Sequence, residues 1–72
     1  MISKVKWFND RKGFGFIEYN EKEDIFAHYT EIKAQGYKTL SVGQEVSFNL
    51  INTNKGYQAH NIEVIKKYEG VK

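Results

Sequence analysis

The chain has 72 residues, no cysteine and a formal net charge of +2, and 15% of its residues are aromatic. This length predicts one domain, and the lack of cysteine excludes disulfides and thiolate metal sites and fits a reducing cytoplasm. No apolar run approaches the ~20 residues of a membrane-spanning helix, and the N-terminal residues have no signal-peptide core, so a cytoplasmic protein without membrane contacts is expected. Residues 1–66 are expected to form the domain and residues 67–72 a fraying tail.

Alternating polar and apolar residues predict short strands joined by polar turns, with no internal repeat or linker. The strands are expected at residues 2–9, 14–20, 24–29, 44–52 and 57–66. Thr30 is expected to cap a single helical turn at residues 31–33. On the fourth strand, Val46, Phe48 and Leu50 are expected to point into the core.

The most informative stretch of the chain combines aromatic residues, glycines and a lysine: Lys12-Gly13-Phe14-Gly15-Phe16-Ile17-Glu18-Tyr19. In a strand, alternate side chains point to opposite faces, so Phe14, Phe16 and Glu18 share one face. Because a buried carboxylate is costly, that face is predicted to be exposed and to display its rings. Gly13 and Gly15 lack Cβ atoms, so a flat ligand could approach the backbone there. The stretch fits a single-strand RNA-binding pattern, with Ile in the place of Val.

The third predicted strand carries a matching face. Phe26 and His28 alternate with Ile25 and Ala27, and the aliphatic pair predicts which face lies inside. Rings on equivalent faces of two adjacent strands would form a platform on which unpaired bases stack. The alternative, that these rings form the core, is disfavoured because Ile17, Ile25 and Ala27 already supply an inner face.

No long stretch shows the 3.6-residue period of an amphipathic helix. This argues against the mixed α/β RNA-binding domain, which carries a similar motif but needs two helices on one face of its sheet. Five short strands in a small chain instead predict an all-β fold, a five-stranded antiparallel OB-fold barrel.

At these motifs the sequence resembles the bacterial cold-shock proteins, and the resemblance extends from Lys4 to about Ile62. The segments that carry it are Val5–Asn9, Lys12–Ile17, Asp24–Tyr29, Gly36–Leu40 and Gly43–Phe48. Members of this family have a five-stranded barrel, bind single-stranded RNA and DNA, and act as RNA chaperones with effects on transcription and translation. The resemblance implies the same kind of partner for this chain.

By that resemblance, the nucleic-acid-binding side chains are aromatic, basic and polar residues from several strands and loops. They are Lys4, Lys6, Trp7, Phe8, Lys12, Phe14, Phe16, Asp24, Phe26, His28, Tyr29, Tyr37, Lys55 and Gln58. The chain departs from the usual family pattern at Ser3, Tyr29, Tyr37, Tyr57 and His60. Of these, Tyr57 stands where Pro is common and His60 where Ala is usual, which leaves the shape of the last hairpin open.

Trp7 presents a conflict within this set. Strict alternation groups Trp7 with Val5, away from Lys6 and Phe8, whereas the resemblance places Trp7 on the binding face. A β-bulge or a strong twist near Asn9 would reconcile the two, and we expect Trp7 to be exposed.

The charged and polar members of the set have ordinary alternatives. The lysines could contact phosphates, but a lone surface lysine is usually only solvated. Asp24 and Gln58 could bond to base edges, although Asp24 also suits the start of a strand. His28 and His60 lack a third metal ligand, and no nucleophile has a partnering base, so no metal, cofactor or catalysis is expected.

Two functions are consistent with these features. The favoured one is a cytoplasmic module that binds single-stranded RNA or DNA, pyrimidine-rich strands best, and keeps strands unpaired by mass action. The alternative is a protein-interaction barrel that uses the same aromatic patch. A monomer is expected, although small barrels also exchange strands into dimers.

Overall fold

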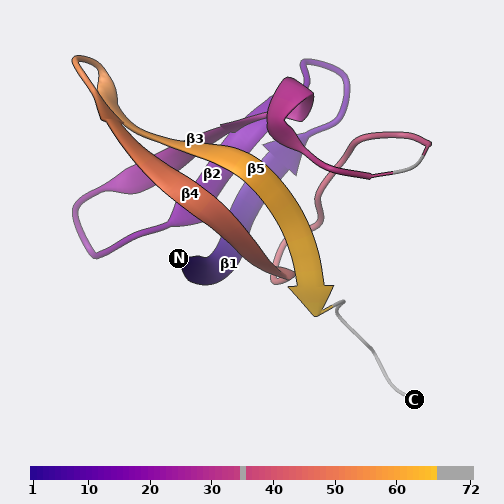
Figure 1. Ribbon diagram of the computed structural model, residues 1–72, viewed down its shortest axis with the longest axis horizontal. Coiled ribbons are helices and arrows are strands. Elements are labelled where there is room, and N and C mark those ends of the chain that lie inside the picture. The colour runs from indigo at the N-terminus through magenta and orange to yellow at the C-terminus, as the bar shows by residue number, and fades with distance from the viewer. Residues whose placement is uncertain (35, 67–72) are drawn as a thin grey trace.

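The computed structural model of the protein describes residues 1–34 and 36–66. Its elements are β1 (Ile2–Asn9), β2 (Phe14–Glu18), β3 (Asp24–His28), the 3-10 turn η1 (Tyr29–Glu31), β4 (Glu45–Thr53) and β5 (Gly56–Lys66) (Figure 1). All strands occur where the alternation predicts them, and β2 ends two residues earlier than expected. The fraying predicted for residues 67–72 lies outside the described residues.

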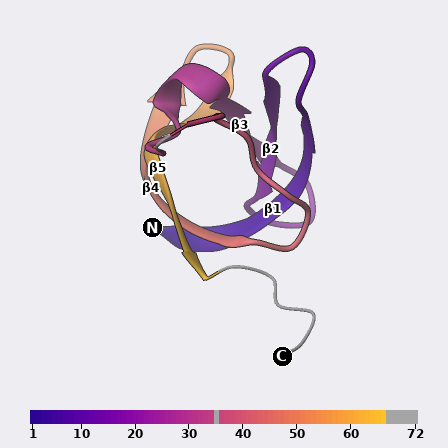
Figure 2. The ribbon, with the colours of Figure 1, turned by 90° about the vertical axis from the view of Figure 1, so that its right-hand side faces the viewer.

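The strands close into a barrel in the order β1-β2-β3-β5-β4, and Figure 2 shows the ribbons curving around a common interior. In this barrel the pairs β1–β2, β2–β3, β1–β4 and β4–β5 are antiparallel, as predicted. The pair β3–β5 is parallel. Parallel neighbours need a long connection, and here the chain between them contains η1, a loop and all of β4. The all-β OB-fold barrel is confirmed, with one parallel junction.

The interior of the barrel is filled mainly by aliphatic side chains, most from the strands and two, Ile32 and Leu40, from the connection between β3 and β4. They are Val5, Ile17, Ile25, Ala27, Ile32, Leu40, Val46, Phe48, Ala59 and Ile62. The predicted inward positions Val46 and Phe48 are buried, and Leu50 packs against the core while remaining partly exposed. Because small barrels are packed solid by such side chains, most of the aromatic rings remain outside.

The helical turn after β3 begins two residues earlier than predicted. It covers Tyr29–Glu31, not residues 31–33, and its N-cap is His28 and not Thr30. The His28 side chain accepts a hydrogen bond from the backbone N–H of Thr30 at 3.3 Å. The prediction failed because an imidazole nitrogen performs the role that Ser, Thr, Asp or Asn usually performs at this position.

Candidate nucleic-acid interface

A β-bulge in β1 decides the direction of Trp7. Val5 pairs with Ile17 and Trp7 pairs with Phe16, so β1 has one more residue than β2 in this interval. The extra residue reverses the alternation, and Trp7 lies on the outer face with 40% of its surface exposed. The predicted exposure of Trp7 is confirmed, although the bulge precedes Trp7 and is not near Asn9.

The same bulge turns Phe8 toward the interior. Phe8 pairs with Gly15 and packs, half-buried, against the core. Its predicted place on the outer face with Lys4 and Lys6 is wrong, because that prediction counted alternation straight through the bulge. Lys4 and Lys6 themselves are exposed.

The rings of β2 and β3 lie side by side outside the barrel, as predicted. Phe16 pairs with Phe26, and Phe14 pairs with His28. The ring centroids of Phe14 and Phe16 are each 5.8 Å from that of Phe26. Trp7 joins them from β1, with its ring 5.5 Å from Phe16 and 5.9 Å from Phe14. Three neighbouring strands therefore contribute to one aromatic surface.

The row of rings continues into η1. The His28 ring lies 6.3 Å from that of Phe26 and 4.8 Å from that of Tyr29, which is exposed. We call these six contiguous rings the aromatic platform: Trp7, Phe14, Phe16, Phe26, His28 and Tyr29. Such a surface accepts any base, because every base presents a π face.

The two glycines of the β2 motif make room for the protein's own chain. A Cβ atom on Gly15 would lie 2.5 Å from the Cα of Phe8 in β1, and one on Gly13 would lie 2.6 Å from the Tyr29 ring. Both glycines are buried, so the expectation that they let a flat ligand reach the backbone is wrong. They instead let β1 and Tyr29 pack closely, which brings the rings of the aromatic platform together.

The cap at His28 also determines which ring nitrogen carries the proton. Nδ1 accepts the backbone N–H of Thr30 and lies 2.8 Å from the Thr30 hydroxyl. Because a backbone N–H can only donate, the neutral ring carries its proton on Nε2. His28 is partly exposed, and its ring forms part of the aromatic platform.

Two predicted contact residues are partners of each other. The Nζ of Lys6 lies 3.1 Å from Oδ1 and 3.2 Å from Oδ2 of Asp24. Both side chains are solvated, and an exposed pair of this kind contributes only about 0.2–1 kcal/mol. A ligand that offers a phosphate to Lys6 and a base edge to Asp24 can therefore replace the pair.

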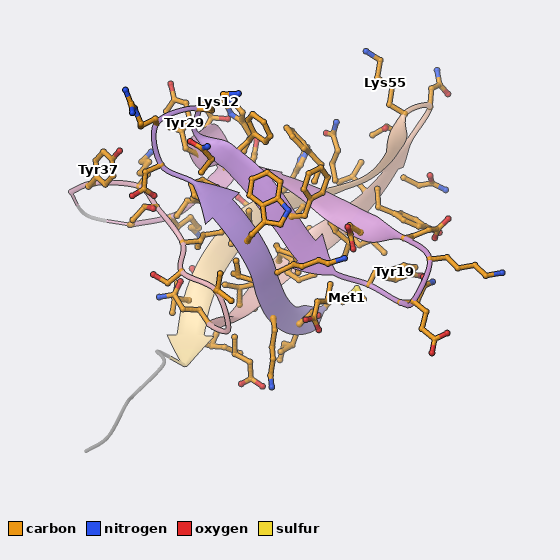
Figure 3. All side chains as sticks on the ribbon, turned by 180° about the vertical axis from the view of Figure 1, so that it is seen from behind. Met1, Lys12, Tyr19, Tyr29, Tyr37 and Lys55 are labelled. Atoms are coloured by element: carbon orange, nitrogen blue, oxygen red, sulfur yellow. The ribbon has the colours of Figure 1, made fainter. Side chains whose placement is uncertain are left out.

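The other lysines of the predicted set lie on three different parts of the barrel. Figure 3 shows Lys12 beside Tyr29 and Lys55 at the tip of the β4–β5 hairpin. Lys4 pairs with Glu45 of β4, on the side of β1 away from β2. The structure thus brings Lys12 next to the platform, whereas Lys4 lies on the β4 side of β1 and Lys55 on the β4–β5 hairpin.

The remaining predicted contacts lie at two edges of the platform. Gln58 pairs with Phe26 across the parallel junction of β3 and β5. Tyr37 lies on the loop before β4 with 71% of its surface exposed, away from the sheet in Figure 3. Tyr37 and Tyr29 both line a recess of about 390 Å³ between this loop and the β1–β2 turn.

This recess includes charged residues that the sequence reasoning did not assign to the site. Asp10, Arg11 and Lys38 line it together with the assigned residues. Arg11 directly precedes Lys12, and Lys38 directly follows Tyr37. Adjacency to an assigned residue was the signal that could have identified Arg11 and Lys38, whereas Asp10 has no such neighbour.

At another edge of the barrel, Tyr19 and Tyr57 pack ring to ring with centroids 4.7 Å apart. The pKa of Tyr57 is raised above its ordinary value, first by a hydrogen bond with Tyr19 that favours the protonated Tyr57 hydroxyl, and further by electrostatic repulsion from Tyr19, by burial and by repulsion from Glu23. Tyr57 thus remains a neutral phenol at physiological pH. Tyr57 was one of the two residues for which the sequence did not predict the shape of the last hairpin. In the structure, its ring contact with Tyr19 connects the start of β5 to the residue that follows β2.

Among the residues that the structure describes, neither histidine belongs to a metal-binding cluster. Across residues 1–34 and 36–66, no three His, Cys, Asp or Glu side chains gather closely enough to hold a metal ion. The same part of the chain contains no helix of the length and apolar character needed to cross a membrane.

Comparisons with known proteins agree with this geometry. Residues 1–65 match the family described as the 'Cold-shock' DNA-binding domain. The chain is 55% identical over 62 residues to the cold shock-like protein CspB of Bacillus cereus. This match covers 86% of this chain and 95% of that protein. The chain is 56% identical over 59 residues to the cold shock protein CspD of Bacillus subtilis strain 168, covering 82% and 89% respectively.

A solved structure supports the fold independently. The barrel is similar to Drosophila Unr CSD456, with a TM-score of 0.71 and 22% sequence identity. The match covers 99% of this chain and 28% of that chain.

Proposed function

This chain belongs to the cold-shock domain family of nucleic-acid-binding proteins, and we propose that it acts in the cytoplasm as an RNA chaperone. The observation that supports the proposal is the aromatic platform, six contiguous rings on the outside of the barrel. Unpaired bases stack on such rings, and each contributes about 1–3 kcal/mol whatever its identity. In a duplex the base faces are covered by neighbouring bases, so the platform selects the unpaired strand.

The proposed mechanism is mass action. A protein that binds only the unpaired state shifts a hairpin toward open strand by an amount set by its affinity and concentration. Keeping transcripts open in this way would affect transcription and translation without any reaction or cofactor.

We assign three roles to the predicted site residues. Stacking belongs to the aromatic platform and Tyr37, whereas the half-buried Phe8 packs against the core and offers a base only its exposed edge. Phosphate contacts belong to the lysines Lys4, Lys6, Lys12 and Lys55. Base-edge contacts belong to Asp24, Gln58 and the Nε2–H of His28. The ion pair of Lys6 with Asp24 is exchanged for contacts to the strand.

The expected ligand preference follows from base stacking within the free strand. Pyrimidine-rich strands stack weakly on themselves and are flexible, so they are expected to bind most tightly.

We propose that a single chain carries the complete site, because all assigned residues lie on one barrel.

The decisive test uses Trp7, which is the only tryptophan in the chain. Titration with oligothymidine should quench its fluorescence, because bases stack on or beside the indole. A duplex of the same length, at the same nucleotide concentration, is the control and should quench much less. An unchanged spectrum together with no binding by an independent measurement would refute the proposal and favour the protein-interaction barrel.

A further inference from the structure

We propose that Asp10 is a positioning residue that holds Tyr37 beside the recess, an inference that rests on the proposed single-strand binding. The Tyr37 hydroxyl donates to the backbone carbonyl of Asp10 at 3.2 Å. The Thr39 hydroxyl donates to Oδ1 of the Asp10 carboxylate. We call these two hydrogen bonds the Asp10 latch.

The latch joins a hydrogen-bonded turn to a loop that has few other side-chain hydrogen bonds. In the β1–β2 turn, the backbone N–H of Gly13 donates to the Asn9 carbonyl at 2.8 Å, and that of Lys12 donates to the Asn9 side chain at 2.9 Å. In the loop, both side-chain hydrogen bonds from the described residues 36–39 to the rest of the described chain end on Asp10. The loop is next anchored at Leu40, which is buried.

The position of Tyr37 makes this latch relevant to binding. Its ring is largely exposed, so packing alone does not fix its direction. Tyr37 and Tyr29 line the same recess, with the cations of Arg11, Lys12 and Lys38 also on its lining. A ring already held beside that recess loses less conformational freedom when a base stacks on it, and this preorganisation increases affinity.

The placement of the Asp10 carboxylate supports the same interpretation. A carboxylate among three cations opposes the approach of a phosphate, so its presence is not explained by direct contact with a polyanion. Its role as acceptor for Thr39 explains it, and an amide oxygen would serve equally well in this role.

The test compares variants that remove one atom group at a time. Thr39→Val removes the hydroxyl while keeping the shape of the side chain, and Asp10→Ala removes its acceptor. Each should weaken oligothymidine binding by about three- to tenfold, because one hydrogen bond and the order that it imposes on Tyr37 are lost. Asp10→Asn is the matched control, and it should bind at least as tightly as the unaltered chain.

A double-mutant cycle separates positioning from a general structural effect. In a Tyr37→Ala background, Thr39→Val should have no further effect on affinity, because the latch acts through the Tyr37 ring. The latch is refuted if Thr39→Val binds normally, if it weakens binding equally in both backgrounds, or if Asp10→Asn behaves like Asp10→Ala. Failure of the unaltered chain to bind oligothymidine would refute the proposed function itself, which distinguishes the two outcomes.

Discussion

At the scale of single residues, the clearest contrast is between two phenylalanines on different faces of the barrel. Phe48 is only 3% exposed and belongs to the core, whereas Phe16 lies in the aromatic platform. Phe48→Ala would leave a cavity and should destabilise the fold by about 3–5 kcal/mol. Phe16→Ala leaves no enclosed cavity and should cost less than about 1.5 kcal/mol of stability. Urea unfolding of the two variants gives this comparison directly.

The loss of affinity for oligothymidine should be larger for Phe16→Ala than for Phe48→Ala, which is the reverse of the order expected for the loss of stability. Phe16→Ala should lose roughly 1–3 kcal/mol of affinity for oligothymidine, because one stacking surface is gone. The folded fraction of Phe48→Ala should bind almost normally, since Phe48 lies inside the barrel. If Phe16→Ala is the more destabilising change and binds normally, the platform is not the binding surface.

His28 shows how one residue can serve two purposes at this scale. Its Nδ1 caps η1, which carries Tyr29, while its ring is part of the platform. In the proposed complex, the cap would leave Nε2–H as the donor to a base, and the backbone would set the orientation of this donor.

At the scale of elements, the close contact of β1 with β2 determines the platform. Gly15→Ala should destabilise the protein by about 3 kcal/mol or more, because its Cβ would meet the backbone of Trp7 and Phe8 and force the two strands apart. Thermal unfolding followed by circular dichroism measures the loss. The displaced Trp7 should also show altered fluorescence in the residual folded fraction.

Gly56→Ala is the matched control for this substitution. Gly56 has a φ of +119°, but a Cβ there would meet no atom within 4 Å. Its replacement should therefore cost only the backbone strain, about 1–2 kcal/mol. If the two variants lose the same amount of stability, the close contact of Gly15 with β1 is not what makes Gly15→Ala destabilising.

At the scale of the whole molecule, charge should make a moderate contribution to binding. If three to five lysines each neutralise one phosphate, the slope of log affinity against log salt is roughly −2 to −3.5 for a single strand. Lys12→Ala should flatten that slope by about 0.7, because Lys12 lies beside the platform. Fluorescence titrations at several salt concentrations measure it.

Lys22 provides the control for this measurement, because it is exposed in the β2–β3 loop, among acidic residues. Lys22→Ala should leave the slope unchanged. A slope near zero for the unaltered chain, or equal changes for both variants, would show that binding does not depend on the phosphate contacts assigned here.

The sequence by itself predicted the strands, the inner and outer faces of β2 and β3, and the four rings that these strands display. Those features depend on strand alternation, which follows from backbone geometry within a few residues. Phe16, Phe26 and Ile25 therefore lie on the faces that the sequence indicates. The resemblance added Trp7 and Tyr29, which alternation alone did not place on the outer face.

Only the tertiary structure decided how the strands pair and what the loops contact. The bulge that exposes Trp7 and turns Phe8 inward is a mismatch in count between β1 and β2, which neither strand contains alone. The parallel junction of β3 and β5 and the contact of Gly15 with β1 also arise from packing. The Asp10 latch joins Asp10 to Tyr37 and Thr39, which follow it in the sequence by 27 and 29 positions. Such contacts depend on which segments the closed barrel brings together, and the local periodicity of the sequence does not predict this.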